Sequence, residues 1–142
     1  MADIGLEGQL KLKNAKILMI GAGGLGSPAC LYLSGAGIGT LGLVDADVVD
    51  ESNLHRQIIH TEDRVGMNKC QSAKIAISQF NRHTKVVTFE TRLTADNADE
   101  IIGSKEHNWD IVMDGSDNAS TRYLINDACC LHGKPLVSGS AL

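Results

Sequence analysis

The chain has 142 residues, of which 43% are hydrophobic and 21% charged, and its formal net charge is −4. This length holds one domain with a substantial core but not two full domains. The acidic balance and an aromatic content of only 4% argue against a nucleic-acid surface, and the apolar runs are too short to span a membrane.

The first 36 residues predict a helix, a strand and a second helix, in that order. Residues 5–15 have helical spacing, and the side chains that we expect to face the core are Leu6, Leu10 and Leu12. Residues 17–20 form an apolar run without polar alternation, which is typical of a strand buried on both faces. The second helix presents small or apolar side chains on one face, at Leu25, Ala29, Leu33 and Ala36.

Between that strand and that helix lies a glycine turn of the form G-x-G-x-x-G, made by Gly21, Gly23 and Gly26 with an additional Gly24. Such a turn lets a ligand approach the main chain, and the free amides at the helix start attract a phosphate. A second apolar run ends on Asp45, 19 residues beyond Gly26, where a carboxylate can accept hydrogen bonds from ribose hydroxyls. The turn and the acid together predict a nucleotide site. Glycines that serve only close helix–strand packing remain the alternative.

Residues 46–65 form a long polar connection, which we expect to be an ordered, ligand-covering segment tethered by Ile58 and Ile59. The rest of the chain alternates between the two kinds of element. The pattern predicts helices over residues 66–80, 96–102 and 118–131, and strands over 41–44, 85–90, 109–114 and from 135 onward. Helical spacing predicts the inward faces of the first and last of these helices, at Met67, Cys70, Ala73, Ile77 and Phe80, and at Leu124, Ala128 and Leu131. This alternation predicts an α/β fold: a doubly wound, mostly parallel, Rossmann-like sheet with helices on both faces.

Ligands of such sheets bind at the carboxyl ends of the strands, and several charged residues are expected to gather there. Lys69 falls in the first turn of a helix, where a cation is disfavoured by the helix dipole unless a polyphosphate is bound. A solvated surface lysine is the alternative, and for Arg56 the alternative is a surface ion pair. Asp117 and Asn118 have the position of a helix cap, which does not exclude a metal role.

The cysteines and histidines carry no metal signature. No pair among Cys30, Cys70, Cys129 and Cys130 has C-x-x-C spacing, and all four fall on expected helices, as is typical of buried, unreactive thiols. We therefore expect a cytoplasmic protein without a catalytic cysteine in these residues. The five histidines lack metal-ligand spacing and are interpreted as surface or capping residues: His55, His60, His83, His107 and His132.

With these residues in place, the sequence resembles the adenylating domain of the MoeB/ThiF family, which is related to ubiquitin-activating enzymes. The run D-x-D-x-V-x-x-S-N-L-x-R-Q is highly specific to that family, and KLKNAK, HRQIIH and RVGMNK are most similar to its eukaryotic branch. That branch activates ubiquitin-related sulfur carriers used in tRNA thiolation and molybdopterin synthesis. The matching segments are GQLKLKNAKILMIGAGGLGSPA, GLVDADVVDESNLHRQIIHTEDRVGMNK, MDGSDNASTRYLIND and PLVSGSA.

The resemblance implies that the protein binds ATP and Mg²⁺, and that the C-terminal glycine carboxylate of a ubiquitin-like sulfur-carrier protein attacks the α-phosphate to give an acyl-adenylate and pyrophosphate. It implies Arg56, Lys69 and Asp117 as catalytic residues. Asp117 would hold Mg²⁺, with Asn118 beside it. The implied nucleotide contacts are the turn (Gly21, Gly23, Gly24 and Gly26), Asp45 at the ribose, and Asn53, Arg56, Gln57 and Lys69 at the phosphates.

The resemblance also implies a homodimer and parts outside this sequence. Relatives carry an arginine-rich segment upstream and, downstream, further strands, zinc-binding C-x-x-C pairs, a reactive cysteine and, in the eukaryotic branch, a rhodanese-like domain. Residues 1–142 are thus expected to be a partial ATP-binding adenylation domain, with Zn²⁺ only in the missing part. Two alternatives stay open: an NAD-dependent oxidoreductase with a generic Rossmann domain, and the non-catalytic half of a heterodimeric activating enzyme.

Overall fold

The sheet has β1 (Lys16–Ile20) at its centre, between β2 (Thr40–Val44) and β4 (Ile111–Asp114). In this computed structural model, which describes residues 4–140, β3 (Lys85–Phe89) and β5 (Leu136–Ser138) form the two edges. The strand order is β3-β2-β1-β4-β5, and every neighbouring pair is parallel. The predicted doubly wound, parallel sheet is therefore confirmed. Of the family-like segment PLVSGSA, only Ala141 lies outside the described residues.

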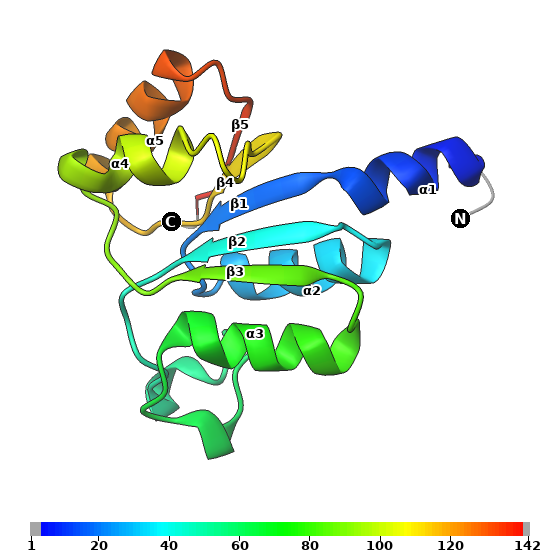
Figure 1. The fold of residues 1–142 in the computed structure, drawn as a ribbon. Helices are drawn as coiled ribbons and strands as arrows, with labels where there is room; N and C mark the ends of the chain where they lie inside the picture. Colours follow the sequence, from blue (N-terminus) through cyan, green and yellow to red (C-terminus); the bar gives the residue numbers. More distant parts are fainter. Residues whose placement is uncertain (1–3, 141–142) are drawn as a thin grey trace.

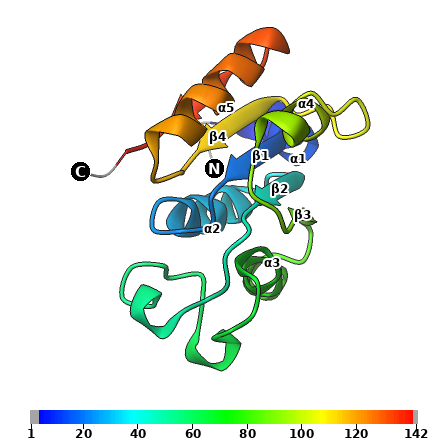
Figure 2. The same ribbon diagram turned by 90° about the vertical axis from the view of Figure 1, so that its left-hand side faces the viewer.

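The helices divide between the two faces of this sheet. The helices α2 (Gly26–Ala36) and α3 (Lys69–Phe80) cover one face, and α4 (Ala95–Ile102) and α5 (Ala119–Leu131) cover the other (Figures 1 and 2). Successive side chains of β1 alternate between the two layers: Ile17 and Met19 belong to the α2–α3 core, whereas Leu18 and Ile20 belong to the α4–α5 core. A strand buried on both faces must be apolar throughout, which is why its sequence shows no alternation.

The leading helix α1 (Gly5–Asn14) is present but contributes little to the core, contrary to the expectation for its leucines. Leu6 and Leu10 are exposed, and only Leu12 packs against the α2–α3 core. The helix projects beyond the start of β1 (Figure 1), so most of its length has no sheet beneath it. It is attached to the end of α2 by a hydrogen bond that Gln9 donates to the Ala36 carbonyl, at 3.3 Å.

The buried face of α2 agrees only in part with the predicted one. Ala29 and Leu33 pack against the α2–α3 core as expected, but Leu25 is exposed. The fully buried residues of the helix are Gly26, Ser27, Cys30 and Ser34. Both serine hydroxyls find partners: Ser27 Oγ lies 3.3 Å from the Ala22 carbonyl and Ser34 Oγ lies 3.4 Å from Thr84 Oγ1. Hydropathy misses the two serines because a small side chain whose hydroxyl is hydrogen-bonded can be buried.

The last residues of α3 and α5 were expected to point inward and do not. Phe80 and Leu131 are 61% and 73% exposed, whereas Ile77 and Ile125, each in the interior of its helix, are fully buried. Each exposed residue is the final residue of its helix. Helical spacing identifies the right face but not which residues at the end of a helix are covered by the rest of the fold.

The connection from β2 to α3 is ordered, as predicted. It contains two short 3-10 helices, Glu51–Asn53 and Glu62–Arg64, and an antiparallel bridge between Val48 and Asn68. Of the two isoleucines expected to tether it, Ile59 is buried in the α2–α3 core and Ile58 is exposed. One anchor therefore holds the middle of the segment against the sheet layer.

Three of the four cysteines are buried as expected, but Cys130 is exposed. Burial raises the pKa of the Cys30 and Cys70 thiols to about 12 and that of Cys129 to about 11. These three thiols stay protonated at neutral pH, which agrees with unreactive core residues.

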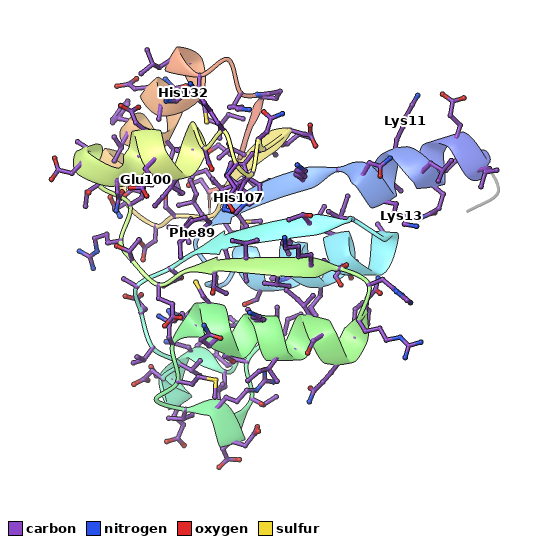
Figure 3. The ribbon with its side chains drawn as sticks, in the orientation of Figure 1. Lys11, Lys13, Phe89, Glu100, His107 and His132 are labelled. Atoms are coloured by element: carbon purple, nitrogen blue, oxygen red, sulfur yellow. The ribbon has the colours of Figure 1, made fainter. Side chains whose placement is uncertain are left out.

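An aromatic cluster closes the space between the end of β3 and the α4–α5 layer. Phe89 and His107 meet edge to face with their ring centroids 5.8 Å apart (Figure 3), and His107 stacks on Trp109 at 5.0 Å. Trp109 is buried, and its Nε1–H donates to the Ile101 carbonyl at 2.9 Å. Among the helices formed by residues 4–140, none has the length and hydropathy needed to cross a membrane.

Candidate functional site

A cavity of about 570 Å³ opens at the carboxyl ends of β1, β2 and β4. The chain runs from β1 to one side of the sheet and later returns to its other side at β4, and ligands of open α/β sheets bind at such a reversal. Nine of the eleven residues predicted for the nucleotide site line this cavity: Gly21, Gly23, Gly24, Asp45, Arg56, Gln57, Lys69, Asp117 and Asn118. Fold and motif thus bring together residues that lie far apart in the sequence.

Gly26 and Asn53 do not line the cavity. Gly26 is buried against the turn, where an added Cβ would stand 1.9 Å from the Gly21 carbonyl oxygen. Asn53 acts through its main chain, because its carbonyl accepts hydrogen bonds from the amides of Arg56 and Gln57 at 3.1 and 3.0 Å. Both residues therefore shape the site from behind its surface.

The main chain of Ala22, in the middle of the glycine turn, is held from two sides. Its N–H donates to Asp45 Oδ2 at 2.8 Å, and Oδ1 of the same carboxylate accepts from the Asp47 amide at 2.8 Å. Its carbonyl faces His60 Nε2 at 3.1 Å. Asp45 therefore organises the turn, a role that the sequence did not reveal, and its carboxylate has further lone pairs for a ligand in the cavity.

Lys69 is only 6% exposed, so its interpretation as a solvated surface lysine is wrong. Within residues 4–140 its ammonium makes one ion pair, with Asp47 Oδ2 at 3.3 Å, and the Asp47 side chain is itself 61% exposed. A buried cation at the positive end of a helix dipole is unfavourable. An anion in the cavity would reverse that balance and use the remaining ammonium donors.

Arg56 extends along the glycine turn. Its Cγ and Cδ lie 3.8 Å from the position that a Cβ would take at Gly24. Its Nη1 donates to the Ser52 carbonyl at 3.2 Å and lies 3.3 Å from His55 Nε2. Across the part of the chain that the structure describes, no carboxylate pairs with this guanidinium, so the surface ion pair considered for it is absent.

Gln57 is buried, and its Oε1 has no hydrogen-bond partner in the described structure. Its Nε2 lies 3.7 Å from where a Cβ of Gly23 would stand, so the side chain borders the turn directly. An unpartnered buried carbonyl costs about 1–3 kcal/mol. A ligand or a ligand-bound water that donates a hydrogen bond here would remove that cost, which fits a group held in the cavity.

The loop after β4 separates two roles. Asn118 is the cap of α5, since its Oδ1 accepts from the Thr121 amide at 2.9 Å, and the exposed Asp117 carboxylate has no protein partner among the described residues. Asp114 is buried and accepts from the Ser116 amide at 2.9 Å, which is a structural role. No cluster of three His, Cys, Asp or Glu side chains occurs in residues 4–140. Because Mg²⁺ is often held by one or two carboxylates together with phosphates, Asp117 fits that ion alongside a nucleotide.

Two further cations line the cavity and were not predicted. Arg92 follows β3, and Arg122 lies in the first turn of α5, where its Nη2 donates to the Ser116 carbonyl at 2.9 Å. With Arg56 and Lys69 they make four cationic side chains, against three carboxylates at Asp45, Asp47 and Asp117. The cavity is thus positive in a chain of net charge −4. The position of Arg92, two residues after a predicted strand, was the signal that could have found it.

His60 is buried, which corrects its interpretation as a surface or capping residue. Its Nδ1 lies 2.9 Å from Ser72 Oγ, and its Nε2 lies 3.1 Å from the Ala22 carbonyl. Burial lowers the pKa of His60, and the charges of Lys69 and Arg64 lower it further, against the hydrogen bond to Ala22 and the charge of Asp45. The ring is therefore neutral at pH 7.

The free energy of unfolding is expected to fall as the pH is lowered from 7.5 toward 5, partly through His60. Because the pKa of His60 is lowered in the folded protein, only the unfolded chain gains this proton as the pH passes below about 6.5. Protonation then favours unfolding until the pH reaches the folded-state pKa. Urea titrations at several pH values should give a shallower pH dependence for His60→Gln than for the wild type. Identical slopes would contradict this assignment.

A model of the ThiF family matches residues 1–142. The chain is 60% identical over 140 residues to the adenylyltransferase and sulfurtransferase MOCS3 of Dictyostelium discoideum, covering 99% of this chain and 32% of that protein. It is 53% identical over 142 residues to the protein of the same name from Culex quinquefasciatus, covering 100% of this chain and 32% of that one. The chain thus spans about a third of the length of these relatives.

Solved structures also resemble the chain. The E. coli tRNA N6-threonylcarbamoyladenosine dehydratase TcdA, in complex with ATP, superposes with a TM-score of 0.90 at 28% identity and covers 96% of this chain and 55% of its own. E. coli MccB with MccA-N7isoASN gives a TM-score of 0.83 at 28% identity, covering 93% of this chain and 38% of its own. The similarity therefore includes a protein whose structure holds ATP.

Proposed function

The chain belongs to the ThiF family, and on that premise we propose that it is the ATP-binding part of an enzyme that adenylates the C-terminal glycine of a ubiquitin-like sulfur-carrier protein. The relatives named adenylyltransferase and sulfurtransferase support the reaction class, and the ATP complex of TcdA supports the nucleotide. Because the chain spans about a third of those relatives, sulfur transfer, zinc binding and dimer formation are assigned to the longer protein.

The observation that carries this proposal is the buried Lys69 ammonium, which lines the same cavity as the glycine turn. It lies at the cavity with a single, largely exposed carboxylate partner, and Arg56 has no carboxylate partner within the described ranges. Binding of a redox dinucleotide requires the glycine turn and the ribose-binding acid but not two additional cations. Reaction of a triphosphate requires the turn, the acid and the two cations, since negative charge grows on the leaving pyrophosphate during the reaction.

In this mechanism the glycine turn and Asp45 hold the nucleotide and its ribose, and Arg56, Gln57 and Lys69, with Asn53 behind them, hold the phosphates. Asp117, beside Asn118, would hold Mg²⁺, which when bound neutralises phosphate charge. A carboxylate oxygen of the carrier forms a bond to the α-phosphorus while the bond from that phosphorus to the bridging oxygen of the pyrophosphate breaks. No general base is needed, because a C-terminal carboxyl group is ionised at neutral pH.

The carrier is proposed to serve tRNA thiolation, molybdopterin synthesis or both, on the basis of similarity to the eukaryotic branch. We place the reaction in the cytoplasm. Four free cysteines among the described residues support a reducing compartment. We also propose that the longer protein forms a homodimer, as the family resemblance implies.

Calorimetric titration of the chain with Mg-ATP and with NAD distinguishes the adenylating enzyme from the NAD-dependent oxidoreductase. We expect ATP to bind at least about tenfold more tightly than NAD, a difference of about 1.4 kcal/mol, because only ATP offers a terminal phosphate to Lys69 and Arg56. Tight NAD binding without an ATP response would favour the oxidoreductase.

Pyrophosphate exchange with carriers that end in Gly-Gly tests catalysis. Carrier-dependent exchange is expected for the enzyme. ATP binding without any exchange, in this chain and in one extended at both ends, would favour the non-catalytic half of a heterodimeric enzyme, although the grouping of Arg56, Lys69 and Asp117 around one cavity argues against that assignment.

A further inference from the structure

We propose that His60 is a positioning residue for the nucleotide site: by holding the carbonyl of Ala22, it fixes the direction of the Gly23 N–H in the glycine turn. This inference rests on the proposed function for its effect on ATP, but not for its effect on the turn itself. His60 has no place in the cavity lining, so it acts through the main chain and not on the ligand.

The partners of the ring determine its tautomer. The Ala22 carbonyl, 3.1 Å away, can only accept a hydrogen bond, so Nε2 must carry the proton. Nδ1 is then an acceptor, and the Ser72 hydroxyl donates a hydrogen bond to it at 2.9 Å. The neutral ring thus makes one donated and one accepted bond, and rotation about its Cβ–Cγ bond would break both.

Ser72 is a rigid anchor for this arrangement. It is fully buried in α3, one turn after Lys69, and its amide donates to the Asn68 carbonyl at 3.0 Å. Its own carbonyl accepts from Arg64 Nη1 at 2.6 Å, and Arg64 Nε donates to Thr61 Oγ1 at 2.8 Å. His60 therefore connects the turn to the helix that carries Lys69.

The planarity of the peptide bond transmits this restraint into the site. The Ala22 carbonyl and the Gly23 N–H belong to one peptide unit and point in opposite directions. With the carbonyl directed at His60, the Gly23 N–H points away from His60, and Gly23 lines the cavity. This N–H donates to no acceptor among the described residues, so it is free for an anion.

The turn needs such a restraint because glycines lie on both sides of Ala22. Gly21 adopts a φ of +93°, and two glycines give this stretch more conformational freedom than other residues would. Asp45 fixes the Ala22 N–H, but without His60 the carbonyl would keep only the longer contact with Ser27 Oγ, at 3.3 Å. The peptide between Ala22 and Gly23 could then rotate.

Two substitutions of His60 separate its two hydrogen bonds. In His60→Gln the side-chain amide nitrogen reaches the place of Nε2 and can donate to Ala22. In His60→Asn the amide matches only the place of Nδ1, so it can accept from Ser72 but cannot reach Ala22. Both remove the titrating ring, and both leave the lining of the cavity unchanged.

Both variants and the wild type should be compared in two measurements: ATP affinity at pH 7.5, and amide hydrogen exchange of residues 21–26 without nucleotide. Urea unfolding of each protein shows whether it is folded. We expect His60→Asn to weaken ATP binding about tenfold or more, as loss of an aligned donor to a charged group implies, and to speed exchange in the turn. His60→Gln should stay within about threefold of the wild type in affinity and show wild-type exchange.

If both variants weaken ATP binding and speed exchange, or if neither does, the positioning role is overturned. A wild type that does not bind ATP would refute the proposed function alone, because the exchange rates still test the turn. Should His60→Asn fail to fold, Ser72→Ala takes its place. This variant removes the hydrogen bond at Nδ1 that holds the ring and should speed amide exchange in residues 21–26. Unchanged exchange in that variant would also overturn the inference.

Discussion

In a full-length version of the protein, replacing Lys69 by alanine is expected to lower carrier-dependent pyrophosphate exchange about a hundredfold or more while the fold survives. The ammonium is buried at the cavity, where low solvent access makes its interaction with a phosphate stronger than at the surface. The fold tolerates the loss because the only partner of Lys69 among the residues of the described chain, Asp47, is largely exposed and can be hydrated instead.

Lys74→Ala is the matched control for this experiment. Lys74 lies on the same helix, so the control removes the same charge and the same side chain, but it is exposed and does not line the cavity. Exchange should be close to that of the wild type, and urea unfolding should show both variants folded. A similar loss in both variants, or no loss in Lys69→Ala, would show that the phosphate site is wrongly assigned.

Replacing Gly26 by alanine is expected to destabilise the protein by about 3 kcal/mol or more. The new Cβ would stand 1.9 Å from the Gly21 carbonyl oxygen and 2.9 Å from its carbon, and both are main-chain atoms of the turn. No side chain can move aside to relieve this overlap, so the turn or the start of α2 must shift.

Gly24→Ala provides the comparison within the same turn. Its Cβ would meet only the flexible side chain of Arg56, at 3.8 Å, which is ordinary contact. We expect its free energy of unfolding in urea to lie within about 0.5 kcal/mol of the wild type. Equal stability of the two variants would mean that the turn does not have the described conformation.

The order of elements was predictable because two periodicities are strong in this sequence. The uninterrupted apolar run at residues 17–20 indicates a doubly buried strand, and the spacing of Cys70, Ala73 and Ile77 indicates the buried face of α3, with all three fully buried. The ends of helices were less predictable. Phe80 and Leu131 continue the helical pattern but are exposed, because only tertiary packing determines which residues at the end of a helix are covered.

The candidate site was also predictable only in part. Its motif residues, such as Arg56 and Asp117, could be predicted because each stands in a continuous family-like stretch of sequence. The burial of Lys69 and His60 could not be predicted, because both residue types are more often exposed and only the packing shows that these two are buried. Arg122 was missed because it becomes part of the cavity only after α5 folds against the sheet.

The double use of Asp45 affects how sugar recognition can be studied. The carboxylate that we assign to the ribose also anchors two backbone amides, those of Ala22 and Asp47. Any substitution at this position changes the shape of the empty pocket together with the contact to the ligand, so the resulting loss of affinity overstates what the hydroxyls contribute. That contribution becomes measurable only by editing the nucleotide, with 2′- and 3′-deoxy analogues of ATP on the unaltered protein.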